Sequence, residues 1–297
     1  AATDFSRLLA EQPADAFYDF AYSAFAHREW HEQRLLIFSS QAATVASALQ
    51  QFAAGEASSD AAICSGSALS KARGPVFLYS GNGSQWAGMG RRLLAEEPLF
   101  RQTIREVDAL FNRYADYSIE DELLGRNGDD RYQYTEIAQP TLFALQVGLT
   151  RMLRQRRLMP VAVVGHSVGE VAAAWASGAL SLADAVAVIY QRSRLQGLTK
   201  GAGQMSAVAM GQPACTELLL ELGLEKRLVL AGANSSRGVT VAGCPQDLTR
   251  LEASLTARQI SFKRLDLDYA FHSPAMDAVE AEIQASLAQP RPGATSI

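Results

Sequence analysis

Ser167 lies in the sequence Gly-His-Ser-Val-Gly at residues 165–169, the G-x-S-x-G pattern of a nucleophilic serine on a sharp turn. Once a base removes its proton, a serine hydroxyl can attack a carbonyl carbon and form a covalent ester. The preceding run 160–164 is apolar and β-branched, which predicts a buried parallel strand. The following alanine-rich run predicts a helix that ends at Gly178. These flanks favour an activated serine over the alternative, an ordinary strand–helix turn.

Four histidines could supply the base. His27 and His31 are spaced i, i+4, which allows a metal pair, but we favour a solvated or packing role and predict no metal site. His166 adjoins the nucleophile and is expected to point to the opposite side of the turn. His272 remains, within Tyr-Ala-Phe-His-Ser-Pro at 269–274, immediately after a predicted strand. We therefore expect His272 to be the base, with a structural histidine as the alternative.

An oxyanion at the attacked carbonyl needs donors that are already in place. The N–H of Val168, directly after the nucleophile, is one candidate. The second is the N–H of Asn82, in the glycine-rich segment 81–90 that follows the predicted strand 75–80. A phosphate-binding loop is an alternative for this segment, but the segment lacks the Gly-Lys-Ser/Thr ending.

Arg192 follows the nucleophile by 192 − 167 = 25 residues, on a helix that is predicted to begin at Ser181 with a capping box reaching Asp184. Arginine offers a rigid fork of donors that suits a carboxylate, and its charge survives burial. The alternative is a surface arginine, as we expect for Arg194. The residues alone leave both possibilities open.

Strands and helices alternate after residue 74, which indicates an α/β protein with a parallel-sheet, α/β-hydrolase-like core. We assign residues 74–203 and 269–297 to this core. Residues 204–268 show the order β-α-β-β-α-β and are predicted to form an inserted ferredoxin-like small subdomain. Residues 1–73 are predicted to be a small α+β domain.

The composition is that of an ordinary globular protein, with 48% hydrophobic and 20% charged residues. A net charge of -4 gives no electrostatic reason to expect nucleic acid or an anionic membrane as partner. No stretch approaches the ~18 apolar residues of a membrane span. Cys64, Cys215 and Cys244 are expected to be core thiols of a cytoplasmic protein. Both ends of the sequence resemble cut points, so we expect a piece of a longer polypeptide.

Taken together, these motifs resemble the acyltransferase domains of polyketide synthases, and they are similar to malonyl-CoA:acyl-carrier-protein transacylases. Residues from about 75 onward resemble the catalytic domain, and residues 1–73 resemble the linker that joins a ketosynthase to it. The resemblance rests on Gly-His-Ser-Val-Gly-Glu at 165–170, Gly-Asn-Gly-Ser-Gln-Trp at 81–86, Gln139-Pro140, Arg192, Ala-Phe-His-Ser-Pro at 270–274 and the stretch 22–34.

The resemblance implies a Ser–His dyad in which Ser167 is the nucleophile and His272 the base. Arg192 would bind the free carboxylate of the extender unit. Gln139 would line the pocket, and His166 is counted with these substrate-binding residues.

The oxyanion hole implied by the resemblance is formed by the N–H groups of Asn82 and Val168. Many members carry Gln at the position of Asn82, a change that a backbone donor tolerates. The family also has a C-terminal part that closes the large sheet and orients the base through a backbone carbonyl. We expect that part to be missing after Ile297.

Three residues bear on the extender unit. Phe271, directly before the base, is positioned to fill the volume that a methyl branch on the malonyl α-carbon needs. Val168 also resembles the malonyl-selecting pattern, whereas Tyr269 points the other way, because malonyl-type domains more often have histidine there. We give Phe271 most weight and expect a strong but incomplete preference for malonyl-CoA, since one methyl group is worth only ~1–3 kcal/mol.

The predicted function is therefore transfer of malonyl from malonyl-CoA to the phosphopantetheine thiol of an acyl carrier protein, with no permanently bound cofactor. The expected partners are that carrier protein and an adjacent ketosynthase domain. Two alternatives stay open at this point: a serine hydrolase such as a thioesterase, and an inactive docking module of a megasynthase. A hydrolase would place an acid between serine and histidine, for which Asp184, Asp266 and Asp268 are available.

Overall fold

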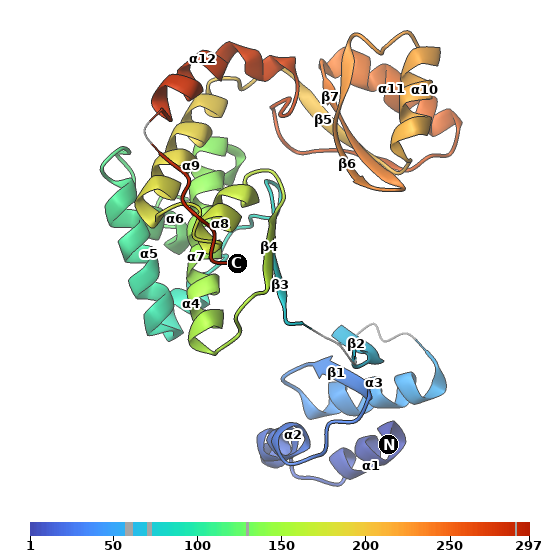
Figure 1. The fold of residues 1–297 in the computed structure, drawn as a ribbon. Helices are drawn as coiled ribbons and strands as arrows, with labels where there is room; N and C mark the ends of the chain where they lie inside the picture. Colours follow the sequence, from blue (N-terminus) through green and yellow to red (C-terminus); the bar gives the residue numbers. More distant parts are fainter. Residues whose placement is uncertain (57–61, 70–72, 129–130, 289) are drawn as a thin grey trace. The chain divides into compact units, whose positions relative to one another are not determined.

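The computed structural model describes residues 1–56, 62–69, 73–128, 131–288 and 290–297. The chain forms two compact units, Ala1–Arg73 and Gly74–Ile297 (Figure 1). Within the described ranges, no helix has both the length and the apolar character needed to cross a membrane.

The first unit is a small α+β body. Its two strands pair antiparallel, with Gln33 opposite Ser67 and Phe38 opposite Ala62. The hydroxyl of Ser6 in the first helix donates to the carbonyl of Ala46 in the third, and the buried side chains of these helices are Ser6, Leu9, Ala48 and Leu49. The elements are α1 (Ala2–Ala10), a 3-10 turn (Ala14–Ala16), α2 (Phe17–Ala26), β1 (Gln33–Phe38), α3 (Ala42–Ala54) and β2 (Ala62–Ser67). The small and polar residues at 55–73 predict a connector with weak strand character. In the structure this segment contains β2, and its residues 57–61 and 70–72 lie outside the described part.

The larger part of the second unit has an α/β core. Strands β3 (Val76–Tyr79) and β4 (Ala162–Gly165) pair in parallel, with Tyr79 opposite Gly165. Helices gather on one side of these strands (Figure 1). The helices are α4 (Arg91–Glu96), α5 (Pro98–Phe111), α6 (Ile119–Leu124), a 3-10 turn (Arg131–Gln133), α7 (Thr135–Gln155), α8 (Gly169–Ala176), α9 (Leu182–Gly197), a 3-10 turn (Pro274–Met276) and α12 (Asp277–Ser286).

The β3–β4 sheet is covered on one face only in the described chain. Val76, Leu78 and Val164 are 56%, 72% and 50% exposed. The sequence predicts a fully buried strand at 160–164, and this prediction is wrong: the side chains of β4 alternate between half-buried and exposed positions. The carboxyl ends of both strands, which carry the functional loops, meet at the same edge.

Helix α7 lies at the centre of the core, in contact with α5, α6, α8 and α9. Because it is surrounded, it buries residues around most of its circumference over its first fourteen positions. The spacing of leucines at 142, 145, 149 and 153 predicts one apolar face for this helix, but burial does not follow that face: Leu142 is 3% exposed, whereas Leu149 is 37% exposed.

A second sheet completes this unit. Its strands lie in the order β6-β7-β5-β8, and every neighbouring pair is antiparallel. Helices α10 and α11 cover one face and enclose an apolar cluster. The other face carries Met205 and Ala242, which pack against Tyr269 and Phe271. The elements follow the predicted order: β5 (Gln204–Val208), α10 (Gln212–Glu221), β6 (Leu228–Ser235), β7 (Gly238–Gly243), α11 (Pro245–Ala257) and β8 (Phe262–Arg264).

Strand β8 is shorter than predicted. It ends at Arg264 because the chain turns at Leu265–Leu267, where the N–H of Leu267 donates to the carbonyl of Leu265. A seven-residue segment therefore separates β8 from His272, which the sequence places directly after the strand.

The cysteines differ in burial, against the expectation of three core thiols. Cys215 is buried, Cys244 is intermediate and Cys64 is exposed. Cys64 lies on the two-stranded sheet of the first unit, whose strand β2 has no fully buried side chain.

We predict that Gly148→Ala lowers the stability of the second unit. A Cβ at Gly148 would lie 2.5 Å from the ring of Phe100, which is fully buried between α5 and α7. Overpacking costs about 1–3 kcal/mol and should outweigh the ~1 kcal/mol that alanine gains over glycine in a helix. Urea denaturation measures the difference.

Gly232→Ala in β6 is the control, because its nearest neighbour would be an ordinary contact at 3.5 Å. A Gly148→Ala variant more stable than the parent would contradict the prediction, since helix propensity would then dominate.

Candidate active site

Ser167 lies on the turn between β4 and α8 with a backbone φ of 52°, a left-handed conformation uncommon for residues other than glycine. The turn is tight because two glycines allow backbone to touch backbone. A Cβ on Gly165 would lie 2.3 Å from the backbone of Glu170, and one on Gly169 would lie 2.2 Å from the carbonyl oxygen of Tyr79. The strand, the turn and the helix occur where the sequence predicts them.

His272 meets Ser167 from the segment that follows β8. The Ser167 Oγ and His272 Nε2 atoms lie 2.9 Å apart, across 105 residues of sequence. With its proton on Nδ1, the imidazole can accept the hydroxyl proton at Nε2. Among the described residues, His272 forms no other side-chain hydrogen bond. The contact brings together the two predicted partners, and their roles as nucleophile and base stay a prediction.

The loop around His272 is held by its own backbone and by Ser273. His272 has a φ of 57°, and Ser273 is extended, as the following Pro274 requires. The Ser273 hydroxyl donates to the carbonyl of Ala270 at 2.6 Å and accepts from the N–H of Ala275 at 3.2 Å. These bonds fix the turn that presents the imidazole.

Burial lowers the pKa of His272 below its usual value of 6.5, and the positive charge of Arg192 lowers it further. A lower pKa keeps the imidazole neutral, and therefore able to accept a proton, at pH values where an exposed histidine is charged.

Arg192 lies on α9 and reaches the same hydroxyl. Its Nη2 donates to Ser167 Oγ at 3.2 Å, and its Nη1 donates to the side-chain oxygen of Gln139. In the described part of the chain, no carboxylate forms an ion pair with Arg192. Burial lowers the pKa of Arg192 to about 10, an effect that the negative charge of Glu170 partly offsets. The charge thus lies half-buried beside Ser167 without an ion-paired carboxylate among the described residues, which does not fit the surface-arginine alternative.

Helix α9 begins where the sequence predicts. The Ser181 hydroxyl caps it by accepting from the N–H of Asp184 at 3.1 Å. The other arginine, Arg194, pairs with Glu282 at 2.7 Å and faces away from the site. The two arginines therefore lie on different sides of the same helix, one beside Ser167 and the other beside Glu282.

Gln139 is 1% exposed on α7 and bonds to three side chains at once. Its Nε2 donates to Thr135 Oγ1 at 2.5 Å and to Gln196 Oε1 at 2.8 Å, while its Oε1 accepts from Arg192. Thr135 and Gln196 were not among the residues expected at the site from the sequence. Helical spacing could have identified them, since each lies four residues from a predicted site residue on its own helix.

Tyr269 and Phe271 form one unit. Their rings stack with centroids 4.9 Å apart and an interplanar angle of 9°, and both side chains are buried. The N–H of Thr135 donates to the Tyr269 hydroxyl at 3.5 Å, which ties the stack to the start of α7. The sequence treats the two residues as opposing signals, whereas in the structure one supports the other.

The glycine-rich loop after β3 packs against the nucleophile turn. A Cβ on Gly81 would lie 2.6 Å from Nδ1 of His166, so the imidazole of His166 rests on this loop. The N–H of His166 donates to the carbonyl of Tyr79 at 2.9 Å. Neither Val168 nor Asn82 has an acceptor for its N–H among the described residues. Both donors are therefore free, and their use by an oxyanion stays a prediction.

The other two histidines form no metal site. Among the described residues, no group of three or more His, Cys, Asp or Glu side chains could hold a metal ion. His27 instead packs edge-on against the ring of Tyr22 at 5.6 Å.

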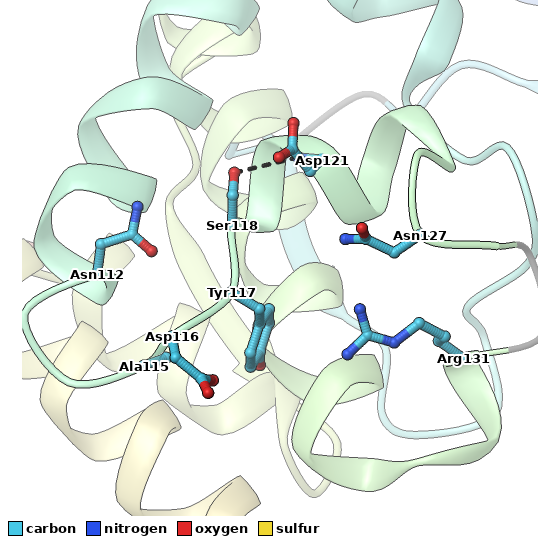
Figure 2. Close-up of a pocket in the computed structure, with 8 residues that line it drawn as sticks. All are labelled: Asn112, Ala115, Asp116, Tyr117, Ser118, Asp121, Asn127 and Arg131. Carbon is cyan, nitrogen blue, oxygen red and sulfur yellow. Dashed lines mark hydrogen bonds between the residues drawn. The ribbon is translucent and has the colours of Figure 1, made fainter.

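An open pocket of about 600 Å³ lies beside the loop between α5 and α6, and it contains none of the predicted site residues (Figure 2). Its polar groups serve the fold: Ser118 caps α6, and Arg131 pairs with the buried Glu122. The lining residues are Asn112, Ala115, Asp116, Tyr117, Ser118, Asp121, Asn127 and Arg131.

We predict that the reactivity of Ser167 persists below pH 6.5. An organophosphonate that modifies activated serines should react at a rate that follows the neutral fraction of His272, and the pKa of His272 is lowered. In Arg192→Gln the midpoint should move to higher pH, because one of the charges that lowers this pKa is removed. The rate of modification, followed by mass spectrometry between pH 4.5 and 8.5, measures both midpoints. Identical midpoints in the two proteins would contradict the coupling.

The comparisons with known proteins agree with the motifs. The model of the acyl transferase domain family matches residues 76–297. The chain is 38% identical over 256 residues to erythronolide synthase EryA2 of Saccharopolyspora erythraea, covering 86% of this chain and 7% of that protein. It is 34% identical over 288 residues to a mycocerosic acid synthase-like polyketide synthase of Mycolicibacterium smegmatis, covering 96% of this chain and 13% of that protein. The chain thus spans a small share of these relatives.

Solved structures give the same result. The acyltransferase domain from module 8 of the salinomycin polyketide synthase matches with a TM-score of 0.83 and 30% identity, covering 100% of this chain and 69% of that one. A loading acyltransferase from the avermectin modular polyketide synthase matches with a TM-score of 0.71 and 35% identity, covering 75% and 70%. These findings confirm the resemblance found in the motifs. The chain belongs to the acyl transferase domain family, and the relatives it matches are polyketide synthases and their acyltransferase domains.

Proposed function

We propose that this chain loads a malonyl extender unit from malonyl-CoA onto the phosphopantetheine thiol of an acyl carrier protein. The observation that carries the proposal is the buried guanidinium of Arg192, which contacts the nucleophile Ser167 and has no bonded carboxylate among the described residues. A malonyl group on Ser167 carries a free carboxylate two bonds beyond the ester carbonyl. That carboxylate is the anion that the arginine lacks.

The reaction runs in two halves. Ser167 Oγ attacks the thioester carbon while His272 Nε2 takes the hydroxyl proton, and the oxyanion accepts from the N–H groups of Val168 and Asn82. The C–S bond breaks, and the CoA sulfur takes the proton from His272 Nε2 and leaves as the thiol, so that His272 is neutral again. In the second half, His272 takes the proton of the phosphopantetheine thiol, whose sulfur attacks the Ser167 ester. Breakdown of that intermediate returns the proton to Ser167 Oγ.

The serine hydrolase alternative finds less support. A hydrolase triad needs an acid at Nδ1 of the base, and among the described residues His272 bonds only to Ser167. Asp184, one of the acids available by chain order, bonds to Ser181 at the start of α9 instead. The short contact between Ser167 and His272 also argues against an inactive docking module.

The extender preference rests on the stack of Tyr269 on Phe271. The stack fixes the ring of Phe271, the residue directly before His272, since Tyr269 is in turn bonded to the N–H of Thr135. A fixed ring excludes a branch on the acyl α-carbon more firmly than a mobile one. We therefore propose malonyl rather than methylmalonyl as the preferred unit. We also propose Gln139 and His166 as substrate-binding residues. Gln139 acts through its hydrogen bond to Arg192, and His166 packs against the glycine-rich loop.

The domain roles follow from the family. Residues 1–73 are proposed as the linker to an adjacent ketosynthase. Residues 74–203 and 269–297 are proposed as an α/β-hydrolase-like large subdomain, and residues 204–268 as its inserted ferredoxin-like small subdomain. We propose that the protein works in the cytoplasm, with acyl-CoA as substrate and no permanently bound cofactor.

Ser167→Ala should abolish covalent labelling by malonyl-CoA, because the ester has no other oxygen at the site. Intact-protein mass spectrometry after mixing with malonyl-CoA measures the adduct, and transfer of the labelled group to a carrier protein separates acyl transfer from release as free acid. Ser236→Ala, at an exposed position in the turn between β6 and β7, is the control. An adduct that persists in the Ser167 variant, or label that accumulates only as free malonate, would reject the proposed function.

Phe271→Ser should raise the use of methylmalonyl-CoA relative to malonyl-CoA by about tenfold or more, as expected for space made available to one methyl group. Competition between the two acyl-CoAs, read from the ratio of adduct masses, gives this value directly. Tyr269→Phe keeps the stacked ring but removes its bond to the N–H of Thr135, so the ratio should shift in the same direction by less than in Phe271→Ser. The extender assignment is wrong if the parent protein loads methylmalonyl faster than malonyl.

A further inference from the structure

Gln196 holds a position that the reaction scheme leaves unexplained. It lies on α9 one helical turn after Arg192, it is 9% exposed, and its Oε1 accepts from Gln139 Nε2 at 2.8 Å. A buried amide that contacts neither the nucleophile nor the base needs a reason to be polar, because an apolar side chain would fill the same space at lower cost.

The polarity of the network fixes which way each amide faces. A guanidinium only donates, so Gln139 must present its oxygen to Arg192. Its two N–H groups must then find two acceptors, and they find Thr135 Oγ1 and Gln196 Oε1. Flipping the Gln139 amide would place donors against the donors of Arg192.

Thr135 and Gln196 do not contribute equally to this arrangement. Thr135 lies on α7, the same helix as Gln139, and a hydroxyl can serve as donor or acceptor in either amide orientation. Gln196 lies on α9, the same helix as Arg192. Gln139 therefore bridges two side chains of α9, and the bridge holds the guanidinium at a set distance from α7. Without the Gln196 oxygen, one buried N–H of Gln139 is unsatisfied, and turning the amide to satisfy it breaks the bond to Arg192.

We propose that Gln196 is a positioning residue for the carboxylate-binding arginine: through Gln139 it keeps the Arg192 fork directed at the acyl group on Ser167. This inference rests on the proposed function, because it concerns recognition of the carboxylate that the extender unit carries. It assigns to Gln196 an effect on dicarboxylic acyl groups that acyl groups without a free carboxylate do not share.

The test compares malonyl-CoA with acetyl-CoA in Gln196→Leu and Gln196→Met, with Gln191→Leu as the matched control. Gln191 lies on the same helix, but its oxygen accepts from Arg194 rather than from Gln139. We expect the two Gln196 variants to raise KM for malonyl-CoA by about tenfold, the scale of one misplaced hydrogen bond to a charged group. Their KM for acetyl-CoA should change less than twofold, and Gln191→Leu should match the parent for both substrates.

The second part is a double-mutant cycle with Gln139→Leu, run with circular dichroism and thermal unfolding on every variant. Because Gln196 is proposed to act only through Gln139, adding Gln196→Leu to Gln139→Leu should raise KM for malonyl-CoA no further. A structural role would instead give additive losses that fall equally on malonyl and acetyl, and that result would overturn the proposal. If the leucine variant fails to fold, the unbranched methionine variant carries the comparison.

Arg192→Ala distinguishes a failure of the proposed role of Gln196 from a failure of the proposed function. If removing Arg192 leaves the ratio of malonyl to acetyl loading unchanged, the proposed function has failed at its carboxylate site. If Arg192→Ala removes the malonyl preference while both Gln196 variants keep it, the function stands and the role of Gln196 is rejected.

Discussion

The buried charge of Arg192 is the constraint on which the rest of the site depends. A guanidinium placed beside a serine, with no bonded carboxylate among the described residues, costs free energy that the fold must offset. Gln139 supplies an oxygen on one side and Ser167 supplies one on the other. Neither neutralises the charge. The protein thus maintains a cation next to Ser167, and in the proposed function this cation binds the carboxylate of the acyl group.

The two helices that carry this charge are stabilised independently of it. Helix α9 starts at the Ser181 cap, and α7 is enclosed by the core on nearly every side. Their positions are therefore set by capping and burial, and the hydrogen bonds from Gln139 to Arg192 and Gln196 orient the side chains between them. This division allows a costly buried charge to persist in a well-packed core.

Much of the site could be predicted because its signals are local. The glycines around Ser167 specify the turn, and the Ser181 cap specifies where α9 begins, so the helix that carries Arg192 follows from the sequence, whereas the side of the helix on which Arg192 lies does not. The β-α-β-β-α-β order of the small sheet also follows from alternation and turn residues within short windows. Turns, helix starts and the order of strands and helices are set by residues close together in the sequence, and these features could be predicted.

Features set by distant residues could not be predicted. The stack of Tyr269 on Phe271 is tied to the N–H of Thr135 on α7, far away in the sequence, so the two residues looked like opposing signals. Gln196 looked like any polar residue on a helix, because its partner Gln139 is 57 residues away. The exposure of β4 depends on which elements cover the sheet, and its apolar composition alone suggests full burial. These three misses concern contacts between elements, whereas the early end of β8 is a miss in the element itself.

The position of Arg192 also links substrate recognition to the base. The positive charge that would bind a carboxylate is one of the causes that hold the pKa of His272 below its usual value. In the proposed function, a bound carboxylate cancels most of that charge, and the pKa of His272 rises toward the working pH. A base with a pKa nearer the working pH accepts a proton with more driving force while remaining largely neutral. Under the proposed function, a dicarboxylic acyl group therefore relieves the contribution of Arg192 to this shift, whereas an acetyl group leaves it in place and burial acts in both cases.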